Sequence, residues 1–154
     1  MSRIETILTK SKFVSDGHLV IFVDGVPFDE LVDSAAPLGY RLAGSVSSLL
    51  GWFHDDDDCK VPWERILPEC GCTSYTPILI CPDDLDFYCG VVIVEVTAEE
   101  DHIRWDRVGI DARQSGAVGT CVRWFSGIGP FRFTRDDYEK CLAAFKTVPS
   151  AASP

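Results

Sequence analysis

Two groups of aspartates are the residues best equipped for chemistry. Four are consecutive, Asp55 to Asp58, and three more, Asp83, Asp84 and Asp86, follow a short apolar run. Acid/base catalysis needs a carboxyl group whose pKa is raised by apolar surroundings, whereas both groups are expected in solvated loops. A calcium-binding loop has a glycine at its sixth position, which the first group lacks. The aspartates therefore favour binding over catalysis.

The seven cysteines and three histidines form no recognisable site. The chain has no CxxC pair, and one residue separates Cys70 from Cys72, which is too short for the usual zinc spacing. Because the cysteine count is odd and the spacing irregular, we interpret the thiols as reduced and packed like small hydrophobes. Two alternatives stay open: a zinc site that uses Cys70, Cys72, Cys81 or His54, and a cysteine nucleophile paired with a histidine.

Sequence motifs of the common catalytic classes are absent. The chain contains no nucleotide-binding loop, no serine-hydrolase elbow and no zinc-protease helix motif. We therefore expect no enzyme activity, no metal and no cofactor.

Charge is concentrated in the middle of the chain. The 154 residues have a formal net charge of −10 and a pI of about 4.6. Residues 51–111 alone carry four basic and fifteen acidic side chains, a net charge of −11. Such a chain is repelled by phosphate backbones and anionic lipid, which argues against nucleic acid and membrane as partners. A basic protein is the better-matched partner.

Aromatic side chains are interleaved with these charges. A ring supplies buried area at an interface while carboxylates set orientation and association rate, although core packing is the alternative for each ring taken alone. The rings are Trp52, Phe53, Trp63, Tyr75, Phe87 and Tyr88. The candidate partner-binding residues are Trp52, Phe53, Asp55, Asp56, Asp57, Asp58, Trp63, Asp83, Asp84 and Asp86.

Apolar patterns and turn signals predict the elements that position these residues. Residues 3–14 and 18–23 flank a turn and predict an N-terminal β-hairpin. The near-continuous Val/Ile run 89–97 predicts a central strand, paired as a hairpin with 102–110. Four adjacent like charges favour an extended, solvated backbone, so residues 52–72 are predicted to be a surface loop. Further strands are predicted at 76–81, 121–125 and 131–133, and helices at 29–35 and 135–146.

The predicted fold is a single α+β domain over residues 1–148, mainly an antiparallel β-sheet packed with a few helices. One of these is a C-terminal helix capped by Thr134, and residues 149–154 are expected to be a flexible tail. No apolar run approaches the roughly 20 residues that span a membrane, and the N-terminus lacks the apolar core of a secretory signal. We therefore expect a cytoplasmic location.

Several runs carry a resemblance that covers about residues 18–146. They are LLGWFHDDD at 49–57, WERILPE at 63–69, PILICPDDLDF at 77–87, VEV at 94–96 and IRWDRVG at 103–109. This pattern of aromatics, prolines and acids, which has no catalytic signature, resembles small acidic bacterial immunity proteins of polymorphic and contact-dependent growth inhibition toxin systems.

The resemblance implies a cytoplasmic antitoxin that binds a cognate toxin domain, often a basic nuclease, and occludes its active site or substrate path without catalysis. Such families diverge at their interfaces, so the candidate residues above rest on charge and expected exposure. Two other functions stay open. One is an acidic adaptor or regulatory subunit that binds another basic protein, and the other is a small Cys/His metal-binding protein.

Overall fold

The computed structural model describes residues 1–147 and begins with the predicted hairpin. A three-stranded antiparallel sheet contains β1 (Ile4–Thr9), β2 (His18–Val23) and β3 (Val26–Pro27) in that order. The β2–β3 turn contains Asp24 and Gly25 with φ of 52° and 81°, as a type I′ hairpin turn requires. Pairing of β1 with β2 along their whole length confirms the N-terminal hairpin.

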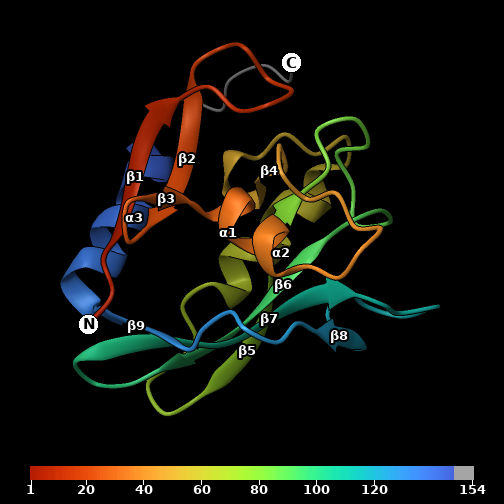
Figure 1. The fold of residues 1–154 in the computed structure, drawn as a ribbon. Helices are drawn as coiled ribbons and strands as arrows, with labels where there is room; N and C mark the ends of the chain where they lie inside the picture. Colours follow the sequence, from red (N-terminus) through yellow and green to blue (C-terminus); the bar gives the residue numbers. More distant parts are fainter. Residues whose placement is uncertain (148–154) are drawn as a thin grey trace.

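Most strands of a six-stranded antiparallel sheet run along the lower part of Figure 1. Its strands are β4 (Val46–Ser47), β5 (Thr73–Ile80), β6 (Val92–Ala98), β7 (His102–Asp111), β8 (Val122–Trp124) and β9 (Phe131–Thr134). The order is β4-β5-β6-β7-β8, and β9 pairs with the other end of β7. The predicted β6–β7 hairpin is confirmed, and every residue of β6 is buried except the half-buried Glu95.

Four helical segments complete the fold. They are α1 (Phe28–Ala35), the 3-10 turn η1 (Ser48–Leu50), α2 (Asp56–Arg65) and α3 (Arg135–Thr147). Both predicted helices are confirmed. The hydroxyl of Thr134 accepts a hydrogen bond from the Asp137 amide at 3.1 Å, as expected of the residue that caps α3.

Helix α2 contradicts the prediction that residues 52–72 form an extended loop. The Asp55 carboxylate accepts a hydrogen bond from the Asp57 amide at 2.9 Å and caps the helix, and the next three aspartates occupy its first turn. The first amides of a helix lack intrahelical partners and form the positive end of its dipole, so carboxylates stabilise them. This attraction outweighs the mutual repulsion of side chains that project into solvent.

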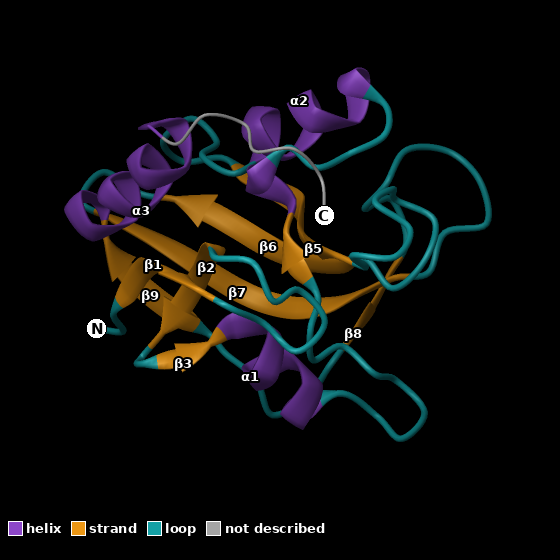
Figure 2. Ribbon diagram, turned by 90° about the horizontal axis from the view of Figure 1, so that it is seen from above, coloured by secondary structure: helices purple, strands orange, loops and turns teal. Residues whose placement is uncertain are grey.

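The three-stranded sheet and the helices lie over the same side of the six-stranded sheet (Figures 1 and 2). The main hydrophobic core fills the space between them and is centred on Trp105, whose ring contacts Phe28 and Phe133 at centroid distances of 5.0 and 5.1 Å. The Tyr138 hydroxyl donates to the Ile66 carbonyl at 2.6 Å and accepts from the Trp105 indole at 3.2 Å. This buried pair of bonds ties α3 to β7 and to the end of α2.

A second hydrophobic cluster lies where the segment before α2 meets the β5–β6 connection, residues 81–91. Successive residues at the start of β6 belong to different clusters. Val91 and Ile93 lie in the second cluster, and Val92 and Val94 lie in the main core. Because strand side chains alternate between faces, both faces of the sheet are covered here. The α+β fold with a C-terminal helix is therefore confirmed.

Two predictions concern the ends of the chain and its relation to membranes. The predicted flexible tail, residues 149–154, lies outside the described residues. Within residues 1–147, no helix has the length and apolar character needed to cross a membrane.

Candidate partner-binding face

The first acidic segment is presented by the N-terminal turn of α2. Asp55, Asp56 and Asp57 are exposed, and Asp58 is half-buried. At the other end of the helix, the Thr76 hydroxyl donates to the Arg65 carbonyl at 2.9 Å, which fixes α2 on strand β5. The helix therefore holds its aspartates at one defined place rather than on a mobile loop.

The second acidic segment is the β5–β6 connection. Leu85 and Phe87 point into the second hydrophobic cluster, whereas Asp83 is exposed and Asp84 and Asp86 are half-buried. Leu85 adopts a φ of 52°, unusual for a residue other than glycine, and its side chain is buried, as is that of Phe87. Alternation of buried and exposed residues thus turns the three carboxylates outward.

The structure brings the two acidic segments together. The His54 amide donates to the Leu85 carbonyl at 3.4 Å, and the Phe53 and Phe87 rings contact each other at a centroid distance of 4.7 Å. We call the resulting surface the acidic face. It consists of Asp55, Asp56, Asp57, Asp58, Asp83, Asp84 and Asp86.

Repulsion within the acidic face is visible at Asp58. Partial burial raises the pKa of the Asp58 carboxyl above its ordinary value, and the charges of Asp55, Asp86 and Asp57 raise it further. The Arg113 guanidinium lowers the pKa of Asp58, but its effect is smaller than each of these. Asp86 of the second segment therefore raises the pKa of Asp58 in the first, so both segments contribute to one electrostatic field.

Few cations of the chain neutralise this field. Among residues 1–147, the acidic face has one ion pair, between the exposed side chains of Asp57 and Lys60 at 3.6 Å. Other acids of the middle segment are paired: Glu95 with Arg107 at 2.8 Å, and Asp111 with Arg113 at 2.7 Å. Six of the seven carboxylates of the acidic face thus have no ion-pair partner among the described residues.

Trp52 and Phe53 are not exposed anchors, contrary to the prediction. Their exposed fractions are 5% and 7%, and Trp52 packs at a ring distance of 5.4 Å from the buried His18. Burying a large aromatic ring in a hydrophobic cluster is strongly favourable, and the charged residues next to it in the sequence do not outweigh this gain in free energy. Their role is to support the acidic face from beneath.

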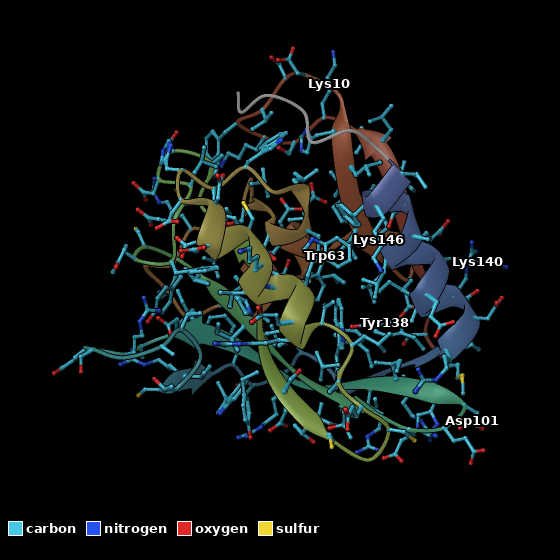
Figure 3. All side chains as sticks on the ribbon, turned by 180° about the vertical axis from the view of Figure 1, so that it is seen from behind. Lys10, Trp63, Asp101, Tyr138, Lys140 and Lys146 are labelled. Atoms are coloured by element: carbon cyan, nitrogen blue, oxygen red, sulfur yellow. The ribbon has the colours of Figure 1, made fainter. Side chains whose placement is uncertain are left out.

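Trp63 is the one predicted aromatic anchor that remains partly accessible. It lines an open groove on α2 together with Gly51, Asp56, Cys59, Lys60 and Glu64. On its other side, the Lys146 ammonium lies 5.2 Å from the ring centroid, and Figure 3 shows the two side chains approaching each other from α2 and α3. The groove adjoins the acidic face through Asp56.

Tyr88 is a surface aromatic that the candidate list did not include. It is 87% exposed and the Arg113 guanidinium lies 5.5 Å from its ring centroid. Both residues line a pocket with Asp58, Arg65 and Val118 at the edge of the acidic face. Its sequence signal was available, because Tyr88 is one of the rings interleaved with the charges of residues 51–111.

The prediction that the cysteines are packing residues is wrong for most of them. Cys141 is buried, Cys59 and Cys81 are half-buried, and all seven are free thiols. Cysteine counts and spacing carry no information on exposure, which depends here on placement in turns. The exposed thiols are Cys70, Cys72, Cys89 and Cys121.

The described residues contain no group of three or more His, Cys, Asp or Glu side chains arranged to hold a metal ion. The ring nitrogens of His102 contact Asp101 at 2.7 Å and Arg132 at 3.1 Å, and His18 contacts the Asp16 carbonyl at 2.8 Å. These histidines are thus engaged by polar neighbours that orient their rings.

Comparison with known proteins adds no relative. No family model, no curated protein and no solved structure matches the chain.

Proposed function

We propose that this chain is a cytoplasmic immunity protein that binds and neutralises a basic toxin domain, most simply a nuclease, by non-catalytic occlusion. The observation that carries the proposal is that two acidic segments meet in one face. Among residues 1–147, the carboxylates of this face have one ion-pair partner, the exposed Lys60. A nuclease attracts phosphates and therefore has a positively charged cleft. The carboxylates of the acidic face match that cleft in sign.

Long-range attraction would be the first contribution of the acidic face. Complementary fields raise association rates by about 10- to 1,000-fold and lose their effect as salt is added. The aspartates are held on a helix turn and on a connection pinned by Leu85 and Phe87, so little ordering would be needed on binding. The acidic face would thus act as a preformed substitute for the phosphates of the substrate.

Apolar anchors would then slow dissociation. Tyr88 and Trp63 flank the acidic face, one in the pocket beside Asp58 and the other in the groove beside Asp56. Tryptophan and tyrosine are among the residues most often found as binding hot spots. They take the place of the buried Trp52 and Phe53 in the proposed interface.

An immunity gene should lie immediately downstream of the gene for its toxin, and this provides the test. The toxin domain encoded by the upstream neighbour would be expressed with and without this chain. The proposal predicts restored growth, a stable complex and loss of the toxin's activity in vitro. Continued toxicity with no complex would contradict it.

An acidic adaptor differs from an immunity protein only in the identity of its basic partner. It would also bind through the acidic face, but its partner would not stop growth when produced alone. Measuring growth with the partner alone therefore separates the two functions.

A further inference from the structure

Two cysteines bracket the acidic part of the β5–β6 connection. Cys81 directly follows β5, and Cys89 lies three residues before β6. Asp83, Asp84 and Asp86 of the acidic face lie between them. The two thiols therefore sit at the base of one loop.

The strand register places the two cysteines close together. The last pair of β5 and β6 is Leu79 with Val92, so Cys81 lies two residues and Cys89 three residues beyond it, each on the segment that continues one of the two paired strands. Opposite residues of antiparallel strands have Cα atoms about 4.5–5.5 Å apart, and just beyond this ladder Cys81 is still near enough to Cys89 to act on its thiol. Disulfides join Cα atoms about 4.4–6.8 Å apart.

Asp84 provides a second, independent link between the two cysteines. Its amide donates to the Cys81 carbonyl at 3.3 Å. Burial raises the pKa of the Cys89 thiol, and the Asp84 carboxylate and the nearby Cys81 raise it further. The Cys81 backbone and the Cys89 thiol thus both lie beside Asp84, and Cys89 is exposed while Cys81 is half-buried, so a small reagent can reach them.

We propose that Cys81 and Cys89 form an intramolecular disulfide that closes the β5–β6 connection, by exchange with a low-molecular-weight disulfide such as oxidised glutathione. One cysteine thiolate attacks a sulfur of the oxidant, breaks its S–S bond and releases one reduced thiol. The other cysteine thiolate attacks the sulfur of the first cysteine and releases the second reduced thiol. The protein loses two protons and two electrons, which the oxidant gains as two thiols.

The disulfide would act on the acidic face by fixing the loop that carries three of its carboxylates. The bond can form without a protein partner, so its formation does not depend on the proposed function. Its effect on affinity rests on that function.

Peptide mapping tests the pairing directly. The reduced full-length chain would be incubated with oxidised glutathione, its remaining thiols alkylated, and the product digested with a protease that cleaves before aspartate. Asp83, Asp84 and Asp86 then separate Cys81 from Cys89, whereas trypsin would leave both in one peptide because no Lys or Arg lies between Arg65 and Arg104. Because Cys59, Cys70 and Cys72 remain in the same peptide as Cys81, chymotrypsin would also be added to cleave after Tyr75, and a link between the resulting Cys81 and Cys89 peptides would then report the disulfide.

The expected result is that the Cys81–Cys89 pair is the main intramolecular product in the folded chain and loses that preference in denaturant. Cys81→Ser and Cys89→Ser should each abolish it, and the matched control Cys70→Ser with Cys72→Ser should leave it intact. Recovery of Cys81 and Cys89 only as alkylated, glutathionylated or otherwise paired residues would overturn the proposal. Equal pairing in the folded and the denatured chain would also overturn it, because the fold would then contribute nothing.

Discussion

At the scale of single residues, Tyr138 is the most heavily used polar group of the core. Its buried hydroxyl bridges the Ile66 carbonyl and the Trp105 indole, and burial raises the pKa of the phenol well above its usual range. The side chain therefore remains neutral and keeps both bonds at neutral pH.

Tyr138→Phe should lower the free energy of unfolding by about 1–3 kcal/mol, because two buried polar groups lose their partner while the packing is conserved. Urea denaturation measures this change. Tyr88→Phe, at an 87% exposed ring, is the matched control and should be nearly neutral. Equal effects of the two substitutions would show that the buried bridge contributes nothing.

Cys141 should be the least reactive thiol of the chain. Burial raises its pKa from 9.0 to about 11, despite the opposing hydrogen bond from Thr6. At about pH 8 its thiolate fraction is therefore very small, and iodoacetamide should modify the exposed Cys70 and Cys121 long before Cys141. Mass spectrometry of a time course checks the order, and early modification of Cys141 in the folded chain would contradict it.

The same shift gives a sign for the dependence of stability on pH. The pKa of Cys141 is higher in the folded than in the unfolded chain, so alkaline pH ionises the unfolded chain first. Its contribution to stability is complete below pH 9.0 and is lost as pH rises from there to about 11. Cys141→Ala should flatten this part of the stability profile.

At the scale of elements, α2 carries the acidic face and begins at Asp55. Asp55→Ala should lower the free energy of unfolding by about 1 kcal/mol, because the Asp57 amide loses its cap. Asp56→Asn, one residue later in the first turn, should cost less since only the dipole interaction changes. Thermal or urea denaturation of both variants checks the ranking, and a larger loss for Asp56→Asn would rule out Asp55 as the cap.

The same helix shows what could be predicted from the sequence and what could not. Strands β6 and β7 and helix α3 were predictable because apolar periodicity, turn residues and a capping Thr134 all agree. At residues 55–58 two local effects oppose each other, repulsion between carboxylates and capping of helix amides, and the sequence alone does not rank them. Exposure of Trp52 and Phe53 was mispredicted because it depends on Phe87 and other partners distant in the sequence.

At the scale of the whole molecule, six carboxylates that have no ion-pair partner among residues 1–147 gather on the acidic face and supply much of the net charge of −10. Elsewhere in the middle segment, ion pairs such as Glu95 with Arg107 reduce the excess. The location of the acidic face was predicted in part, because both segments were named from sequence. Their contact depends on the fold, through the His54–Leu85 bond and the Phe53–Phe87 contact.

Salt should therefore stabilise the free protein. Screening weakens repulsion among the seven carboxylates of the acidic face, whereas its one ion pair is exposed and contributes little. The midpoint of urea denaturation should rise as sodium chloride is added. A fall in the midpoint would mean that attractive pairs, rather than the acidic face, dominate the electrostatic free energy.

The central claim is that the acidic face binds a basic protein, and affinity for the upstream-encoded toxin domain tests it most directly. Asp56→Asn with Asp57→Asn removes two charges from the first turn of α2, and Asp136→Asn with Asp137→Asn removes two from the first turn of α3 as the matched control. Titration calorimetry at low and at high salt would compare both double variants with the unmodified chain. We predict at least a tenfold, or about 1.4 kcal/mol, loss of affinity and a weaker salt dependence for the α2 variant alone. Equal affinity and equal salt dependence of the two variants would contradict the account.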